Sequence, residues 1–148
     1  VVNKWDLVEK NSQTMVEFKK RVYSDLKYLS YAPILFISAL TGQRVPKILD
    51  MVDEVAEQTE KRIPTSQLNK YLGQWVEHSP PPLYSNRNVK LNYMTQVSAG
   101  PPTFVIYTNF PEGIHFSYER YLINQMRETF GFQGVPIRLQ FRKKRKAQ

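Results

Sequence analysis

The sequence predicts two folded parts: an α/β segment of the kind that ends a doubly wound domain, followed by a small α+β domain. Residues 1–62 show a strand–loop–helix pattern twice in succession, which is typical of doubly wound folds. Pro64 then interrupts the second helical pattern. Residues 63–141 follow the order helix, strand, strand, helix, strand, and residues 142–148 form a basic tail.

The elements of the first part are predicted from apolar runs and helical periodicity. Val1-Val2 match the end of a buried strand, and the apolar run 32–37 matches a second strand. Apolar residues recur at helical spacing over 12–29 and again over 45–62. A polar loop follows each strand, so both loops are expected at the carboxyl edge of the sheet, where such sheets bind ligands. The other strands are expected from a segment before Val1.

The second part is predicted to place two helices on one face of a three-stranded sheet. Its elements are expected over 66–78, 88–97, 103–108, 117–130 and 136–142. Alternation in the first strand predicts an inward apolar face, made of Val89, Leu91, Tyr93, Thr95 and Val97. Met94 is accordingly expected to point outward. Ser117 is expected to cap the second helix, and Gly131 to end it.

Positive charge is concentrated in the second part. The chain has a net charge of +8, of which residues 63–148 carry +7 and residues 1–62 carry +1. Five basic residues stand together at 142–146. Such asymmetry predicts that the second part meets a polyanion, although a solvated tail that aids solubility remains an alternative.

Several classes of function are excluded or disfavoured by composition. The chain has no Cys, so disulfides and thiolate metal sites are excluded. Its two histidines, His78 and His115, are isolated, so no metal site is expected. No apolar run approaches the ~20 residues of a membrane span, and no secretory signal is visible. We expect a cytoplasmic protein without a membrane partner.

Two short motifs indicate recognition of guanine. Asn3-Lys4-Trp5-Asp6 fits the NKxD pattern, and Ser38-Ala39-Leu40 fits the SAL/SAK pattern, with which Ras-type GTPases recognise the base. Each motif follows a predicted strand and precedes a predicted helix. The alternative is that Asn3 and Asp6 merely form a turn and that Ser38 caps a helix.

The chemistry of guanine explains these residue types. The Asp6 carboxylate can accept hydrogen bonds from N1–H and N2–H₂ of the base. Asn3 would brace the loop, and the apolar stem of Lys4 would lie over the ring. The backbone N–H of Ala39 would point at O6, with Ser38 holding the loop. A site of this kind can discriminate against other bases by roughly 10⁴-fold.

The sequence contains no phosphate-binding loop. None of its six glycines belongs to a G-x-x-x-x-G-K-[ST] pattern, and no D-x-x-G loop for Mg²⁺ is present. Phosphoryl transfer depends almost wholly on those parts. We therefore expect no catalytic residue here and no GTP hydrolysis by this chain alone. The sequence is expected to be a piece of a longer protein.

Longer stretches of the chain resemble one family. The stretches NKWD, YAPILFISALTGQRV, TQVSAGPPTFVIYTN and HFSYERYLINQMRETFGFQGVPIRL are similar to the C-terminal part of the Der (EngA) family. That family comprises bacterial GTPases with two tandem G domains and a KH-like domain. The resemblance implies that residues 1–62 are the C-terminal remnant of a P-loop G domain and that 63–141 form a KH-like domain.

The same resemblance implies partners and cofactors. It implies a role in biogenesis of the large (50S) ribosomal subunit, whose rRNA the KH-like domain would meet. GTP or GDP would bind the full-length protein, and the missing portions of the G domain would hold Mg²⁺. The family's guanine contacts fall on Asn3, Lys4, Asp6, Ser38 and Ala39. The usual KH loop, G-x-x-G between two helices, is not found, because Pro111-Glu112-Gly113-Ile114 lies between a strand and a helix.

Candidate RNA contacts therefore come from exposed basic residues. They are Lys90, Arg138, Arg142, Lys143, Lys144, Arg145 and Lys146. Tyr93 and Tyr107 could stack on bases, but Tyr93 shares the predicted apolar face and is expected in the core. A second hypothesis is a non-enzymatic RNA-binding adaptor whose first half is only a scaffold. A self-contained enzyme is disfavoured because no nucleophile–base pair is found.

Overall fold

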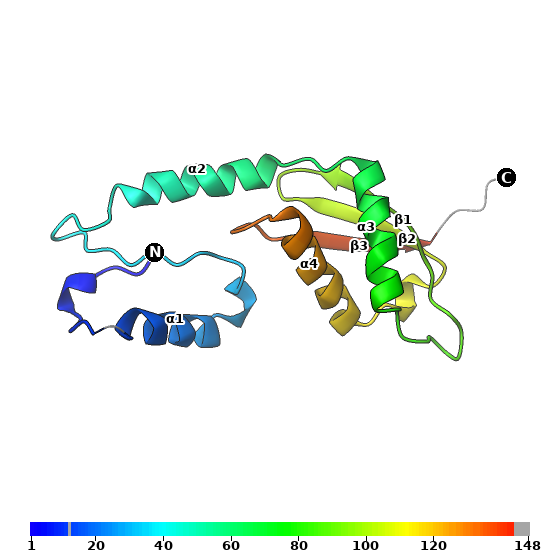
Figure 1. Cartoon of the computed structure of the whole chain (residues 1–148), viewed down its shortest axis with the longest axis horizontal. Helices are drawn as coiled ribbons and strands as arrows, with labels where there is room; N and C mark the ends of the chain where they lie inside the picture. The colour runs from blue at the N-terminus through cyan, green and yellow to red at the C-terminus, as the bar shows by residue number, and fades with distance from the viewer. Residues whose placement is uncertain (12, 144–148) are drawn as a thin grey trace. The chain divides into compact units, whose positions relative to one another are not determined.

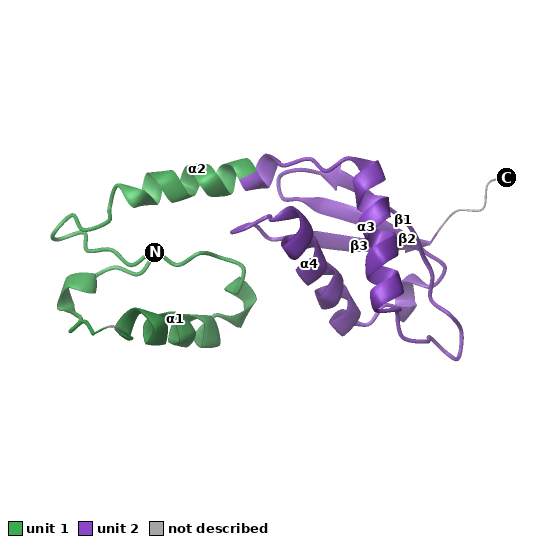
Figure 2. Ribbon diagram, viewed as in Figure 1, with its two compact units in different colours: residues 1–57 green, residues 58–148 purple. Residues whose placement is uncertain are grey.

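The computed structural model describes residues 1–11 and 13–143. Its chain divides into two compact units, Val1–Glu57 and Gln58–Gln148, shown in different colours in Figure 2. The division falls within helix α2 (Lys47–Glu60). Each unit is described by itself below.

In its described residues, unit 1 combines α1 and most of α2 with two extended segments that pair beside Val2 and Phe36. Besides α2, its elements are η1 (Trp5–Leu7), α1 (Thr14–Asp25) and η2 (Lys27–Leu29). Val2 and Phe36 form a parallel bridge, in which the Val2 N–H donates to Leu35 O and the Ile37 N–H donates to Val2 O, both at 2.8 Å. Helix α1 is shorter than predicted because Leu26 leaves the helical region, with ψ at 55°.

Unit 2 is a three-stranded mixed sheet with helices on one face (Figure 1). Its elements are α3 (Thr65–His78), β1 (Leu91–Ser98), β2 (Thr103–Thr108), η3 (Pro111–Gly113), α4 (Phe116–Phe130) and β3 (Arg138–Lys143). The strand order is β1-β2-β3, antiparallel between the first two and parallel between the last two. The predicted order of helices and strands in this part is confirmed.

The core of unit 2 lies between the two long helices and the sheet. Its buried members from α3 and α4 are Leu68, Leu72, Trp75, Tyr118, Leu122, Met126 and Phe130. The sheet contributes Met94, Phe104, Ile106 and Ile137 to the same core. Leu139 and Phe141 of β3 also pack against this core.

The predicted inward positions Val89 and Leu91 are confirmed, but the predicted faces of β1 are wrong from Tyr93 onward, because a bulge reverses them. The register with β2 shifts between Leu91 and Tyr93, which adds one residue to β1. Met94 therefore points into the core and is 1% exposed, whereas Tyr93 is 44% exposed and Val97 is 51% exposed. Strict alternation holds only for a strand without such an insertion.

The start of α4 also differs slightly from expectation. Its cap is His115, whose Nδ1 accepts from the Ser117 N–H at 3.3 Å and lies 2.8 Å from Ser117 Oγ. Ser117, predicted as the cap, is already inside the helix. Gly131 ends α4 as expected, with φ at +90°, a region that favours glycine.

Candidate guanine site and basic surface

Backbone hydrogen bonds bring the two predicted guanine motifs together in unit 1. Besides the Val2–Phe36 bridge, the Trp5 N–H donates to Ile37 O at 2.9 Å. The indole of Trp5 is buried and lies 4.4 Å from the Phe36 ring and 5.3 Å from the Phe18 ring, between ring centroids. The loops that follow the two extended segments are thereby fixed side by side.

Side-chain hydrogen bonds then tie one loop to the other. Asn3 Oδ1 accepts from the Ala39 N–H at 3.0 Å and from the Lys4 N–H at 2.7 Å. Ser38 Oγ donates to Asp6 Oδ1 at 2.5 Å. These bonds join positions that lie 36 and 32 residues apart in sequence, so Asp6 faces the loop that carries Ala39.

The five residues of the candidate guanine site differ in their exposure to solvent. Ser38 is fully buried, Asp6 is half-buried, and Asn3, Lys4 and Ala39 are exposed. Ser38 Oγ also accepts from the Thr41 N–H at 3.2 Å, which holds the second loop in shape. Within the described part of the chain, Asp6 Oδ2 makes no hydrogen bond. One carboxylate oxygen is thus held by the protein while the other is available to a ligand.

Two features of the site differ from the sequence interpretation. The Ala39 N–H, expected to point at the base, is engaged by Asn3. Lys4 adopts the left-handed region, with φ at 64°, which a non-glycine residue rarely occupies. Sequence reasoning also missed Trp5 as the anchor of the first loop, although a large aromatic residue between two polar ones is a recognisable signal.

The described residues contain no group of three or more His, Asp or Glu that could hold a metal ion. None of their helices is long and apolar enough to cross a membrane.

The candidate RNA-binding residues are spread along the sheet of unit 2. Lys90, Arg138, Arg142 and Lys143 are all exposed. Arg138 pairs with Thr103 at one end of β2, whereas Arg142 pairs with Tyr107 near the other end. Arg142 lies four positions along the strand from Arg138, which corresponds to roughly 13 Å. Three further candidates lie outside the described residues: Lys144, Arg145 and Lys146.

At the end of the sheet that carries Arg142, the charged side chains of the strands are basic, and the nearest acidic residue in sequence is Glu112 of η3. The Lys90 N–H bonds Asn109 Oδ1 at 2.8 Å, which places Lys90 beside the end of β2. Lys143 pairs with Thr108 in the same region. Residues 79–111 and 129–148, which include all three strands, contain no Asp or Glu. An anion that approaches this end meets no acidic side chain from the strands.

Comparison with known proteins agrees with the fold. A family model described as the KH-domain-like C-terminal part of EngA bacterial GTPase enzymes matches residues 62–142. Relatives include GTPase Der of Moorella thermoacetica, 52% identical over 145 residues, and GTPase Der of Desulfitobacterium hafniense, 54% identical over 144 residues. GTPase Der of Fusobacterium nucleatum is 52% identical over 145 residues. These alignments cover 97–98% of this chain and 33% of each relative.

The mixed sheet with α3 and α4 on one face, together with this match, defines the class of unit 2 as a KH-like domain. The chain belongs to the EngA (Der) family of bacterial GTPases and corresponds to its C-terminal part. It spans about a third of the length of the curated relatives that it matches.

Proposed function

We propose that this chain is the C-terminal part of a ribosome-assembly GTPase. Residues 1–62 are the end of a G domain that reads the guanine base of GTP or GDP. Residues 63–141 are a KH-like domain that, with the tail 142–148, docks on rRNA of the large subunit. The observation that carries the proposal is the pair of hydrogen bonds from Ala39 to Asn3 and from Ser38 to Asp6. The GTPase Der relatives support the same reading.

Recognition of the base would use groups that already face one another. Ser38 orients Asp6 through Oδ1, so Oδ2 can meet the N–H groups of guanine. The Ala39 N–H, now on Asn3 Oδ1, would be shared with or transferred to O6. Lys4 would cover the ring with its stem. The phosphates and Mg²⁺ would be held by residues outside these 148, since this chain has no phosphate loop.

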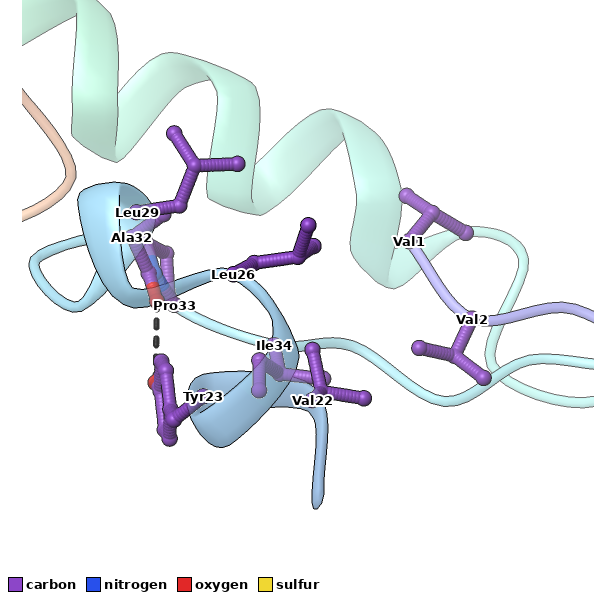
Figure 3. Close-up of a pocket in the computed structure, with 9 residues that line it drawn as sticks. All are labelled: Val1, Val2, Val22, Tyr23, Leu26, Leu29, Ala32, Pro33 and Ile34. Carbon is purple, nitrogen blue, oxygen red and sulfur yellow. Dashed lines mark hydrogen bonds between the residues drawn. The ribbon is translucent and has the colours of Figure 1, made fainter. Parts of the chain in front are cut away.

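Two apolar clefts support completion of the G domain by another segment. One cleft, of about 160 Å³, is lined by the end of α1, by η2 and by residues 1–2 and 32–34. Apart from Tyr23, the side chains that line it are aliphatic, as Figure 3 shows. The other, of about 240 Å³, is lined by Val1, Pro33, Leu35, Ile48, Met51, Val52 and Val55. A two-stranded pair is marginal by itself in water, so we propose that further strands of the G domain cover these surfaces.

The guanine assignment is tested by Asp6→Asn in the protein that contains the whole G domain. Asparagine presents a donor where guanine also presents a donor, whereas xanthine presents an oxygen there. Preference should shift from GTP towards xanthosine triphosphate by roughly 10²-fold or more. Competition binding with the two nucleotides measures this shift. Asp53→Asn, an exposed position on α2, is the matched control. Unchanged selectivity of the Asp6 variant would refute the assignment.

The RNA-docking half is supported by the exposed basic residues and the acid-free strands. Affinity for RNA should fall linearly, on logarithmic axes, as salt rises. Replacing Arg142 and Lys143 together by Gln should reduce that slope by about 0.7 for each phosphate of a single strand that is no longer neutralised. Lys70→Gln, on the helical layer, should leave the slope unchanged. A flat salt response of the parent chain would contradict polyanion binding.

A further inference from the structure

We propose that the helix-free face of the sheet in unit 2 is a stacking platform for the unpaired bases of single-stranded RNA, centred on Tyr93 and Tyr107. This proposal deepens the RNA docking proposed above and rests on it. It assigns two aromatic side chains to the bases, in addition to the cations that would meet the phosphates.

The bulge in β1 creates the platform. Because the register shifts between Leu91 and Tyr93, Met94 enters the core and Tyr93 is turned to the opposite face. There Tyr93 pairs across the strands with Tyr107, and their ring centroids are 6.3 Å apart with an interplanar angle of 42°. A large aromatic ring that is 44% exposed on a strand contributes little to the core.

No described helix of unit 2 covers this face. Both α3 and α4 pack on the side that carries Phe104 and Ile106 (Figure 1). Alternation along β2 places Val105 and Tyr107 on the other side. Val105 is fully buried, so neighbouring side chains cover the sheet there, and the accessible part of this face lies around Tyr93 and Tyr107. Two adjacent rings on a sheet face are the arrangement on which sheet-based RNA-binding modules stack bases.

Positive charge borders the two rings. Arg142 pairs with Tyr107 in the parallel register, so the order across the sheet is Tyr93, Tyr107, Arg142. Arg142 is exposed, and its Nη2 donates to Gln140 Oε1 at 2.8 Å. Lys90 stands on the same outward side by alternation with the buried Val89. With no acidic residue in 79–111 or 129–148, this face is complementary to a phosphate backbone.

Two exposed rings beside basic side chains should bind single-stranded RNA more tightly than duplex RNA. Cations alone bind either form, because both carry phosphates. Aromatic rings add affinity only where a base is unstacked and its flat face is free. Stacking tolerates any base, so the platform should bind with little sequence preference. An acidic protein surface would use the arginine and lysine but would gain nothing specific from two adjacent rings.

The test uses the whole chain and a fluorescein-labelled 12-mer of oligouridine, with a 12-base-pair RNA duplex for comparison. Replacing Tyr93 and Tyr107 together by Thr should weaken binding of the single strand by about 5-fold or more for each base that no longer stacks. Binding of the duplex should be unchanged, and so should the salt slope for the single strand. Replacing both by Phe should preserve affinity. Phe116→Ser removes a ring that is 63% exposed on α4 and should have no effect.

A second measurement needs no variant. A single strand that carries 2-aminopurine should lose fluorescence when it binds the parent chain, because stacking on tyrosine quenches that base. Unchanged fluorescence on binding, or unchanged affinity of the double Thr variant, would overturn the platform. If the salt slope still depends on Arg142 and Lys143, the proposed RNA docking survives that result. If neither RNA binds, both proposals fail together.

Discussion

Single hydroxyl groups connect the two helices of unit 2. Tyr118 Oη donates to Ser79 O at 2.7 Å, and Tyr121 Oη donates to Trp75 O at 3.0 Å. Both acceptors lie at the C-terminal end of α3, where the Ser79 carbonyl has no partner within the helix and the Trp75 carbonyl also accepts from the Ser79 N–H at 2.9 Å. In the described residues, no buried side-chain nitrogen or oxygen lacks a hydrogen bond. These tyrosines thus fill the core and satisfy a helix end with the same side chain.

The buried tyrosines predict a loss of stability at alkaline pH. Burial raises the pKa of Tyr118 above its ordinary value of 10.0, and the neighbouring Tyr121 raises it further. Burial also raises the pKa of Tyr121. The folded state therefore holds these protons more tightly than the unfolded state. Their stabilisation is fully present below about pH 10 and is lost as pH rises through the folded pKa.

Tyr118→Phe tests this linkage by urea unfolding between pH 8 and 11. At pH 8 the variant should lose about 1 kcal/mol, since the hydrogen bond to Ser79 is removed. Above pH 10 its free energy of unfolding should fall less steeply than that of the parent chain. Parallel curves for the two proteins over the whole range would show that Tyr118 does not carry the effect.

At the scale of elements, β1 changes which side chains face the core at the register shift between Leu91 and Tyr93, and a second shift lies between Gln96 and Ser98. Val89 and Leu91 face the core before the bulge, and Met94 faces it afterwards. The edge of β1 at Met94 is occupied by Asn69 of α3, whose Oδ1 accepts from the Met94 N–H and whose Nδ2 donates to Met94 O, both at 2.9 Å. An edge strand presents unpaired backbone groups, and here a side-chain amide pairs with them.

The bulge predicts a sharp contrast between two positions on the same strand. Met94→Ala should cost about 2–5 kcal/mol of unfolding free energy, because it leaves a cavity in a closed core. Val97→Ala should cost less than about 1 kcal/mol, since Val97 is half exposed and loses mainly strand propensity. Urea unfolding of both variants measures the contrast. Equal costs would contradict the bulge, and a larger cost at Val97 would match the unbroken alternation that the sequence pattern suggests.

The helices, β2 and β3 were predictable because each has one dominant periodicity. The β1 bulge was not, because the inserted residue is defined by the partner strand and leaves no mark on alternation in the strand itself. The meeting of Asn3 and Asp6 with Ser38 and Ala39 was predictable, since both pairs follow adjacent parallel segments. The hydrogen bond of Asn3 Oδ1 with the Ala39 N–H was not, because it depends on loop geometry.

At the scale of the molecule, the two units differ in how much core they contain. Unit 1 buries four large apolar side chains, Trp5, Leu35, Phe36 and Ile37. Unit 2 holds the remaining buried apolar side chains of the described residues, gathered mostly in one cluster. Unit 1 also leaves Val1, Leu49 and Val52 more than half exposed. Burial of apolar surface is the main stabilising term in folding, so unit 2 should be the more stable of the two.

Hydrogen exchange of the whole chain tests this difference. Amides of β2 and α4 should exchange only through global opening of unit 2, whereas amides of Val2 and Ile37 should exchange much faster through local opening. Joining the chain to the rest of the proposed G domain should protect Val2 and Ile37 by at least about 10²-fold, because new strands would cover the clefts beside them. The same addition should leave protection in β2 unchanged, which serves as the internal control. If Val2 and Ile37 are already as protected as β2 in this chain alone, unit 1 is a self-sufficient scaffold, and the adaptor hypothesis gains over the incomplete G domain.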